Sequence, residues 1–497
     1  SAMQWKGAVL LVVAFVAWCG WTGVAEGTEY VFYVNPANGT ASGDGSANSP
    51  FLSISEALEV QNATSADTLT IYLAPGDYTG PENVGLSYTA ATLNLLGSGT
   101  AGQTKSAIDC QGTGVGMIVS SVGFTAANIS ITLCQTAVVA EEFALVTLQG
   151  VVVKDIPGTA VLMQDSYMFS CDSCDFSNVR NNSVSGSTYV FSLNRSTVTG
   201  PPGVGTIGGG VDAIVYINGS VNDSTFTDVV GLVGSSISTQ ALKLSGGVSY
   251  ISGNLWDGCA LRLNEDAPVS LAQQWTGKQE AADNLSASGG AVLLQPYDGL
   301  GSFSMANNSF VNCFSYGNGG ALTLVNPTAV TMENFVLDGN RVEGSGGAIY
   351  ITSGTNVTMT NVVLSFNSAE VDGGAIFMED GSTAYLDNCI FSFNTAVVSG
   401  NDIACCSNST SCTTSVYATN TTMLLDSDAT TCTIESWVLT TDDSDDDDGS
   451  SLEWYDITLI ILSAIGVVAL LVGLVAFGVG FLLYKRQMRQ AYEVVDD

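Results

Sequence analysis

The chain has 497 residues, with 12 Lys and Arg against 47 Asp and Glu, and it contains no histidine. The absence of histidine excludes Ser-His-Asp and Cys-His catalysis, zinc sites that need His, and an imidazole pH switch. The formal net charge of -35 argues against DNA or RNA as a partner, because affinity for a polyanion depends on Lys and Arg that neutralise phosphates.

The N-terminal residues have the composition of a secretory signal. Lys6 precedes an apolar run over residues 7–18, and Gly23 and Ala25 occupy the small positions that a signal peptidase needs. We predict a cleaved signal peptide over residues 1–25. An uncleaved signal anchor is the alternative, but the apolar run is shorter than the ~20 residues that a membrane span needs.

Residues 33–78 predict a strand, a short helix and a second strand. The segment reads Tyr33-Val-Asn-Pro-Ala-Asn-Gly-Thr-Ala-Ser-Gly-Asp-Gly45, then Pro50-Phe-Leu-Ser-Ile-Ser-Glu-Ala-Leu58, then Thr70-Ile-Tyr-Leu-Ala-Pro-Gly-Asp-Tyr78. Ser53 and Glu56 have the spacing of a capping box. The segment resembles the opening of pectin-lyase-like right-handed β-helix proteins. We expect the helix to cover the end of the apolar column, which would otherwise expose an unpaired strand edge.

Residues 90–290 contain short apolar strands between turns but no clear period, and we extend the same fold across them. The spacing of Cys110 and Cys134 is close to the length of one coil, so they could bridge neighbouring coils. Thr199–Asp212 and Leu271–Asn284 break the pattern and are predicted to project from the coils. Loops of this kind are the first places to expect a binding site.

A repeat of about 27 residues runs through residues 300–404, a length typical of stacked structural repeats. Its polar columns are Asn340, Asn367 and Asn394, and Gly319, Gly346, Gly373 and Gly400. Its apolar columns, predicted to fill the interior, are Met332, Met359 and Leu386; Val336, Val363 and Ile390; Leu337, Leu364 and Phe391.

The composition of the repeat favours strands over the helical repeats that share its length. Val, Ile, Thr, Ser, Asn and Gly predominate, which is typical of short strands and turns. We therefore predict an all-β fold: a right-handed, single-stranded parallel β-helix over residues 26–437, with an N-terminal cap helix and three strands per coil. The asparagines are predicted to form structural corner ladders rather than a ligand site, and the glycines to permit backbone angles closed to other residues.

Two recurring elements resemble polymorphic outer membrane protein repeats. Phe391-Ser-Phe-Asn394 matches their FxxN element, and Gly346-Gly-Ala-Ile349 and Gly373-Gly-Ala-Ile376 match their GGAI element. The resemblance covers roughly residues 287–404 and implies a surface-exposed, adhesin-like β-helix. Bacterial members end in a translocating β-barrel, whereas this chain ends in one apolar segment, so their outer-membrane location does not carry over.

The asparagines and cysteines agree with export. Twelve asparagines begin an Asn-x-Ser/Thr sequon, an excess over the number that the Ser and Thr content predicts. These candidate glycosylation sites are Asn38, Asn62, Asn128, Asn181, Asn194, Asn218, Asn222, Asn284, Asn307, Asn356, Asn408 and Asn420. Removing Cys19 with the signal leaves 11 cysteines, an odd number, in an oxidising compartment.

The remaining cysteines suggest local staples. Cys171 and Cys174 form a CxxC, for which a local disulfide or two separate pairings are favoured over zinc, because no His and no second CxxC accompany it. A second group is predicted to staple the membrane-proximal end: Cys405, Cys406, Cys412 and Cys432.

The C-terminal part has the features of a membrane anchor. Residues 438–456 include an Asp-rich run over 442–448 and are predicted to form an extended acidic stalk; the run lacks the Gly turn and ligand spacing of a calcium loop. Residues 457–484 carry no charge and are followed by Lys485, Arg486 and Arg489, which predicts a transmembrane helix. Residues 485–497 are then a cytoplasmic tail, and the protein is type I with its ectodomain outside the cell.

Two features of this region bear on partners and location. Gly466, Gly473 and Gly480 line one face of the predicted span with small residues, which permits a homodimer through the membrane helix. Tyr492-Glu-Val-Val495 fits a tyrosine-based sorting signal. We predict the plasma membrane as the location, with an endosomal or lysosomal membrane as the alternative.

The β-helix fold hosts adhesins as well as polysaccharide lyases and hydrolases, so function must come from the residues. The GHG and RIK elements of polygalacturonase-like hydrolases are absent, and no Lys or Arg stands out as a lyase base. Asp257 and Asp372 could serve as an acid/base pair, but Asp372 precedes a Gly-Gly turn. We predict a glycosylated, non-enzymatic surface rod for adhesion or recognition of a glycan or protein ligand, without metal or cofactor. A surface-anchored carbohydrate-active enzyme is the alternative.

Overall fold

The computed structural model describes residues 29–435 apart from residues 65–67, 89–91, 99–105, 113, 121–122, 202–209, 234–241, 246–247, 264–289, 296–301, 328, 407–411 and 424–431. The chain divides into two units, Ser1–Leu439 and Thr440–Asp497, and every described residue lies in the first. The predicted signal peptide, acidic stalk, membrane span and tail, and the predicted loop Leu271–Asn284, lie outside the described residues. Within the described part, no helix is long and apolar enough to cross a membrane.

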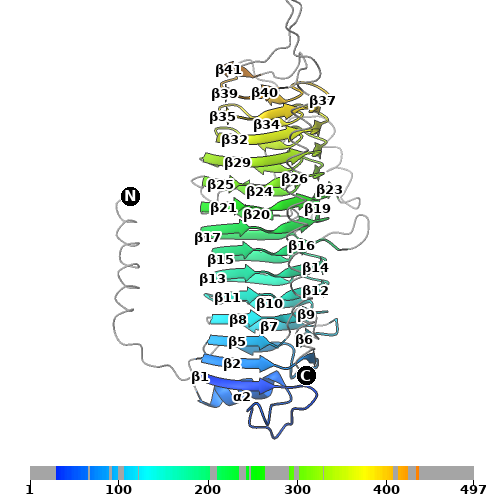
Figure 1. Ribbon diagram of the computed structural model, residues 1–497, viewed down its shortest axis with the longest axis vertical. Coiled ribbons are helices and arrows are strands. Elements are labelled where there is room, and N and C mark those ends of the chain that lie inside the picture. The colour runs from blue at the N-terminus through cyan, green and yellow to red at the C-terminus, as the bar shows by residue number, and fades with distance from the viewer. Residues whose placement is uncertain are drawn as a thin grey trace, which may run out of the picture. The chain divides into compact units, whose positions relative to one another are not determined.

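The described residues form a parallel β-solenoid, in which each strand pairs with the equivalent strand of the next coil (Figure 1). The first series of strands comprises β1 (Glu29–Val34), β2 (Thr68–Leu73), β5 (Thr92–Gly97), β8 (Gly123–Ala127), β11 (Leu145–Gln149), β13 (Val161–Asp172), β15 (Val184–Asn194), β17 (Val211–Asn222), β21 (Val248–Ser252), β25 (Ser302–Ala306), β29 (Ala329–Asp338), β32 (Asn356–Ser365), β35 (Thr383–Asp387), β39 (Ser415–Thr419) and β41 (Thr433–Glu435).

Two further series, numbered second and fourth by their order along a coil, complete most of each coil. In some coils their places are taken by the ends of the long first-series strands. The second comprises β3 (Gly76–Tyr78), β6 (Ser106–Asp109), β9 (Ile129–Thr132), β12 (Val152–Ile156), β14 (Asp175–Val179), β16 (Thr197–Thr199), β18 (Thr225–Thr227), β22 (Leu255–Asp257), β26 (Ser309–Val311), β36 (Ile390–Ser392) and β40 (Thr422–Met423). The fourth comprises β4 (Leu86–Tyr88), β7 (Val115–Val119), β10 (Thr136–Ala140), β20 (Leu242–Ser245), β24 (Val292–Gln295), β28 (Leu322–Leu324), β31 (Ile349–Ile351), β34 (Ile376–Met378) and β38 (Ile403–Cys405).

A third series, which the sequence pattern does not reveal, lies between the second and fourth in the later coils. It forms a separate six-stranded sheet of β19 (Val230–Val233), β23 (Ala260–Leu263), β27 (Phe314–Ser315), β30 (Arg341–Val342), β33 (Ser368–Ala369) and β37 (Thr395–Ala396). Four of these strands have only two residues, too few for an alternating pattern to be visible.

The interior is apolar along the whole solenoid, as the repeat predicts, with one correction. Met332, Met359 and Leu386 are buried, and so are Leu337, Leu364 and Phe391. The prediction that Val336, Val363 and Ile390 also fill the interior is wrong, because Val336 and Ile390 are each 42% exposed. Successive side chains of a strand point to opposite faces, so Val336 and Leu337 cannot both point inward.

One helix, α2 (Ile54–Thr64), contacts β1 and β2 at the first coil. One of the two hydrogen bonds of the predicted capping box is present at its start, since the backbone N–H of Ser53 donates to Glu56 Oε2 at 3.1 Å. Asn83, from the loop after β3, accepts from the N–H of Ile54 at 2.9 Å. Ile54, Ala57 and Leu58 are buried in the core, so α2 packs its apolar face against the first coil.

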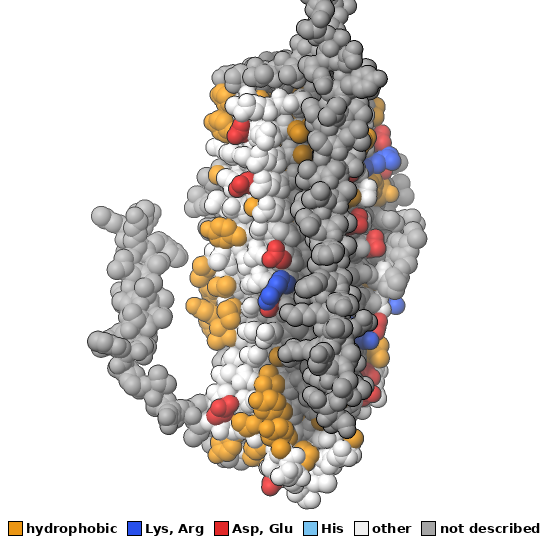
Figure 2. Space-filling model, viewed as in Figure 1, with side chains coloured by type: hydrophobic (Ala, Val, Ile, Leu, Met, Phe, Trp, Pro, Cys, Tyr) orange, Lys and Arg blue, Asp and Glu red, His pale blue; other side chains and the backbone are white. Residues whose placement is uncertain are grey.

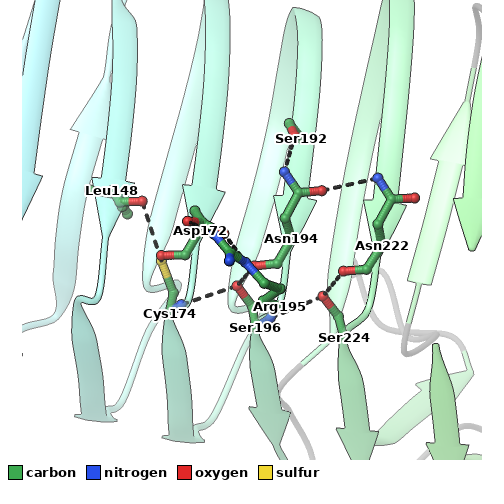
Figure 3. A network of polar contacts seen from close by, with 9 residues as sticks. All are labelled: Leu148, Asp172, Cys174, Ser192, Asn194, Arg195, Ser196, Asn222 and Ser224. Carbon is green, nitrogen blue, oxygen red and sulfur yellow. Dashed lines mark hydrogen bonds and ion pairs between the residues drawn. The ribbon is translucent and has the colours of Figure 1, made fainter. Parts of the chain in front are cut away.

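The buried corner between the first and second series carries a polar ladder. The N–H of Cys174 donates to Ser196 Oγ at 3.2 Å, and the N–H of Ser196 donates to Ser224 Oγ at 3.1 Å (Figure 3). The ladder continues through Asn254, whose Oδ1 accepts from Ser224, to Asn308, whose Oδ1 accepts from Asn254. Each side chain thus satisfies a buried backbone N–H of the preceding coil.

Farther along the solenoid, the buried polar ladder lies at the next corner, after the second series. Asn340 Nδ2 donates to Asn367 Oδ1 at 2.9 Å, and Asn367 Nδ2 donates to Asn394 Oδ1 at 3.0 Å. The structure therefore places the three predicted asparagines as structural corner residues, and each is at most 6% exposed.

The predicted glycine column lies in the loop before the fourth series. Gly319, Gly346, Gly373 and Gly400 all have φ between +65° and +76°. A Cβ on Gly373 would lie 2.2 Å from the carbonyl oxygen of Ile376, so both the backbone angle and the space require glycine there.

Candidate functional site

One outward column of the first series carries a hydroxyl group on nearly every coil. Parallel register aligns equivalent residues about 4.8 Å apart. We call this the hydroxyl column: Thr70, Asn94, Thr125, Thr147, Ser170, Ser192, Ser220, Tyr250, Ser304, Thr331, Thr358, Tyr385 and Tyr417. From Asn94 onward, every member is at least partly exposed.

A second outward column lies two residues farther along the same strands. We call it the amide column: Gln149, Asp172, Asn194, Asn222, Ser252, Ala306, Glu333, Thr360, Asp387 and Thr419. Asn222 Nδ2 donates to Asn194 Oδ1 at 3.0 Å, and Asn194 Nδ2 donates to Ser192 Oγ at 2.9 Å, which links the two columns (Figure 3). Neither column contains Lys or Arg, and Asp172, Glu333 and Asp387 are their only charged members. Because uncharged polar side chains predominate, we call the two columns together the neutral face.

The basic residue that borders the neutral face is already paired. Arg195 Nε donates to Asp172 Oδ1 at 2.9 Å, and its Nη2 pairs with the other carboxylate oxygen (Figure 3). The hydrogen bond and charge of Asp172 raise the pKa of Arg195. Because the two charges offset each other, this part of the face offers hydrogen-bonding groups with little net charge.

Aromatic rings stack along one edge of the neutral face. The ring centroids of Tyr167 and Tyr189 are 6.0 Å apart, and those of Tyr189 and Tyr216 are 5.2 Å apart. Tyr167 is 47% and Tyr216 is 41% exposed. In Figure 2, hydrophobic side chains gather along the edge where β11 begins and where β13, β15 and β17 bend from the fourth series into the first, while uncharged polar groups and backbone cover most of the described surface beside them. We call Tyr167, Tyr189 and Tyr216 the tyrosine ladder.

A different surface, beside the third series, is apolar. Phe366 and Phe393 stack with centroids 5.0 Å apart, and they are 60% and 66% exposed. Val397 and Val398, on the same coil as Phe393, are also exposed. We call these four residues the apolar corner patch.

Two carboxylates lie on neighbouring coils in the same region. Arg341 pairs with Ser368 in the β30–β33 register, so Glu343 stands opposite Glu370. Arg341 Nη2 donates to Glu370 Oε1 at 2.9 Å. Partial burial raises the pKa of Glu343; the charge of Arg341 opposes that shift and the charge of Glu370 adds to it. A carboxyl whose pKa is raised, beside a second carboxyl that pairs with a cation, is an arrangement suited to acid/base chemistry.

The structure does not bring Asp257 and Asp372, the predicted carboxylate pair, next to each other. Asp257 ends β22 and is followed along its column by Val311, Asp338 and Ser365. Asp372 is buried in the glycine-turn loop, where Ser399 Oγ donates to its Oδ1 at 2.6 Å. The two residues belong to different series and different coils, and Asp372 has the hydrogen bond of a turn residue.

Most of the predicted glycosylation sites can be placed on the surface. Asn38, Asn128, Asn218, Asn307, Asn356 and Asn420 are exposed, whereas Asn181, Asn194 and Asn222 are half-buried. The side chain of Asn62 and the residues Asn284 and Asn408 lie outside the described part.

Asn307 starts an exposed asparagine ladder that was not among the predictions from the sequence. Asn334 Nδ2 donates to Asn307 Oδ1 at 3.1 Å, Asn361 donates to Asn334 at 3.0 Å, and Asn388 donates to Asn361 at 2.6 Å. All four have φ between +53° and +56°, a backbone region that Asn tolerates better than most residues. Their regular spacing, equal to that of the buried asparagines, is a signal that could have revealed them.

The structure contains four disulfides among the described cysteines. Cys110 pairs with Cys134, as their spacing suggests, and the CxxC closes locally as Cys171–Cys174. The C-terminal group forms Cys405–Cys432 and Cys406–Cys412. The ligand atoms of Asp380, Cys406 and Cys412 lie within 4.8 Å of one another, but both sulfurs are bonded to each other, so this cluster does not offer thiolates to a metal.

Comparison of the sequence with known protein families gave no match, and neither did comparison with curated proteins. Several solved structures have a chain that follows a similar course. A lacto-N-biosidase of glycoside hydrolase family 136 from Eubacterium ramulus aligns at 10% identity and TM-score 0.43, covering 80% of this chain and 68% of the other.

Two further structures align more weakly. Pectate lyase Pel9A aligns at 14% identity and TM-score 0.32, covering 75% of this chain and 78% of its own. The A-module of mannuronan C-5 epimerase AlgE6 from Azotobacter vinelandii aligns at 13% identity and TM-score 0.31. The alignment covers 78% of this chain and 94% of the module. All three TM-scores lie below 0.5, and no identity among the three exceeds 14%.

Proposed function

We propose that the protein is a glycosylated, single-pass surface protein whose β-solenoid binds a neutral glycan on the neutral face. The observation that supports this proposal is the hydroxyl column, which offers a donor and acceptor on nearly every coil from Asn94 to Tyr417. A neutral polysaccharide presents hydroxyl groups along its length, and such groups pair with side-chain hydroxyls and amides without a charged partner.

The tyrosine ladder supports the same ligand class. Sugar rings have apolar faces of C–H groups, which pack against aromatic rings, while their hydroxyls bond to polar neighbours. Tyr167 and Tyr216 combine exposed rings with adjacent polar columns. The net charge of -35 and the absence of Lys and Arg from both columns disfavour polyuronates and nucleic acids as ligands.

A glycan array with the full-length protein in detergent tests this proposal. We expect binding to neutral linear polysaccharides and weaker binding to polyuronates. Tyr216→Ala should weaken binding several-fold, since an aromatic contact contributes about 1 kcal/mol. Phe366→Ala is the matched control, because it removes an exposed ring outside the neutral face. Absence of neutral-glycan binding, or equal affinity of Tyr216→Ala and wild type, would contradict the proposal.

A carbohydrate-active enzyme is the second candidate function, and the Glu343–Glu370 pair is the observation that favours it. In this reading Glu343 donates a proton to the leaving oxygen, and Glu370 acts as the ionised partner held by Arg341. The same preparation should then release reducing sugars, and Glu343→Gln should abolish release. Glu59→Gln, which changes an exposed carboxylate of the cap helix α2, should retain it. Without release by the wild-type protein, this candidate is excluded.

Glycosylation of the surface asparagines is a separate part of the proposal. We expect Asn307→Gln to lose one glycan, because Asn307 is exposed. Its Oδ1 accepts the hydrogen bond from Asn334, so that bond does not use Nδ2, the atom to which an N-linked glycan is attached. Asn334→Gln is the control, since it changes the neighbouring ladder residue but no sequon. Gel mobility before and after enzymatic deglycosylation of protein from a eukaryotic host measures the difference. Unchanged wild-type mobility after deglycosylation would overturn this part.

Several finer features belong to the same proposal. We take the coils to be right-handed, because parallel strands are joined by right-handed crossovers in nearly all known cases. We take the repeats over residues 287–404 to be of the polymorphic outer membrane protein type, on the GGAI and FxxN elements. The type I topology, the plasma-membrane or endosomal location and the homodimer through the span stay predictions, because they rest on residues 457–497, outside the described part.

A further inference from the structure

Three buried cysteines of the described part are not bonded in the structure, and two of them are neighbours. Asp257 pairs with Val311 in the β22–β26 register, and Ala260 pairs with Phe314 in the β23–β27 register. Both registers have the same offset, so Cys259 stands opposite Cys313 on the next coil. The third free cysteine, Cys389, lies at the other corner of the solenoid, after β35.

The two thiols share one environment. The Sγ of Cys259 donates to the carbonyl oxygen of Phe226 at 3.8 Å, and the Sγ of Cys313 donates to that of Trp256 at 3.8 Å. Each therefore reaches back toward the preceding coil. Burial is the main cause that raises the pKa of Cys259, and the neighbouring Cys313 side chain adds to it.

The geometry of the solenoid fits a disulfide at this position. Equivalent residues of neighbouring coils are about 4.8 Å apart, which lies within the Cα–Cα range of disulfides. The chain already contains a bridge of this kind, because Cys110 and Cys134 join neighbouring coils with a Cα–Cα distance of 4.7 Å. Cys134 also follows the second series, at the same corner as Cys259 and Cys313.

We propose that Cys259 and Cys313 are a modification site that is oxidised to a fifth disulfide during folding in the secretory pathway. This rests on the proposed export of the chain. The pairing would leave Cys389 as the single thiol among the 11 cysteines that follow the predicted signal, which accounts for their odd number.

The oxidant is a disulfide-bonded thiol oxidoreductase of that compartment. One cysteine thiolate attacks a sulfur of the oxidant disulfide, which breaks that bond and forms a mixed disulfide. The second thiolate then displaces the oxidant and forms the Cys259–Cys313 bond. The oxidant leaves as a dithiol that carries the two protons, so one disulfide is lost and one gained. Both thiols are at most 1% exposed in the folded solenoid, so the exchange takes place before these coils close.

The position explains why a bridge is useful there. Cys259 and Cys313 lie on the same two coils as Asn254 and Asn308 and have the same separation in the chain, which is twice that between Asn340 and Asn367. A disulfide that closes a longer loop removes more conformational entropy from the unfolded chain. The proposed bond therefore joins two neighbouring coils where the chain between them is longest.

Disulfide mapping of the full-length protein from a eukaryotic secretory host tests the proposal. The protein is alkylated in acid denaturant without reductant, digested and analysed by mass spectrometry. We expect a linked peptide pair containing Cys259 and Cys313, and alkylation of Cys389 alone. Cys259→Ser should expose Cys313 to alkylation and lower the Tm, whereas Cys389→Ser, the matched control, should leave the linked pair intact.

The outcomes separate this inference from the proposed export. Four linked pairs with Cys259 and Cys313 both alkylated would overturn the fifth disulfide while leaving export in place. Alkylation of all the cysteines that follow the signal would instead overturn export itself. If Cys259→Ser does not fold, mapping of the wild-type protein alone decides the question.

Discussion

Replacing Asn367 with alanine is expected to lower the free energy of unfolding by about 3–5 kcal/mol. Asn367 is fully buried, and its Oδ1 accepts from both the backbone N–H and the Nδ2 of Asn340. Its Nδ2 donates to the carbonyl oxygen of Leu337 and to Asn394 Oδ1. Alanine leaves these partners buried without water to replace the lost bonds. Denaturant unfolding followed by circular dichroism measures the loss.

The exposed asparagine ladder supplies the matched control. Asn361 also bonds to an asparagine on each neighbouring coil, at 3.0 Å and 2.6 Å, but water can replace those bonds. Asn361→Ala should therefore cost about 1 kcal/mol, chiefly because alanine tolerates its φ of +55° less well. Equal losses for Asn361→Ala and Asn367→Ala would show that burial of the ladder is not the source of its contribution.

Gly373→Ala is expected to destabilise the solenoid by a similar amount, about 3–5 kcal/mol. The φ of +67° is unfavourable for alanine, and the added Cβ would lie 2.2 Å from the Ile376 carbonyl oxygen. Because that atom is backbone, the coil itself must move. The shift of the denaturant midpoint, together with protease sensitivity of the coil, measures the effect.

Gly354→Ala separates the backbone angle from the clash. Gly354 has a φ of +73°, close to that of Gly373, but a Cβ there would meet nothing within 4 Å. The expected loss is therefore about 1 kcal/mol, from the backbone angle alone. If Gly354→Ala costs as much as Gly373→Ala, the close approach to Ile376 contributes little and the clash argument is wrong.

The buried asparagine ladder could be predicted because its coils have equal length. Asn340, Asn367 and Asn394 recur at one spacing, and the same residue type is kept at each position. The earlier corner ladder begins at the backbone N–H of Cys174, and its accepting side chains are Ser196, Ser224, Asn254 and Asn308. It has the same structural role, but the residue type changes and the spacing varies from 22 to 54. A scan for repeated letters cannot find a column whose members are interchangeable hydrogen-bond acceptors.

The neutral face could not be predicted from the sequence, for a related reason. Thr125 and Thr147 are neighbours in the hydroxyl column, and so are Tyr250 and Ser304, although the chain between the second pair is more than twice as long. Only the strand register shows that these residues belong to one column. The irregular segments Thr199–Asp212 and Leu271–Asn284 were predicted to be the first places for a binding site. Residues 202–209 of the first segment and all of the second lie outside the described part.

The all-β solenoid, the cap helix and the glycine turns follow from the sequence alone, because alternation, capping and backbone permissiveness are local properties of the chain. Which side chains share a column depends instead on the tertiary structure, since a β-solenoid brings together residues separated by a coil of variable length. The hydroxyl column, the Glu343–Glu370 pair and the Cys259–Cys313 pair are all of this kind. Their chemistry arises from the stacking of coils rather than from any motif along the chain.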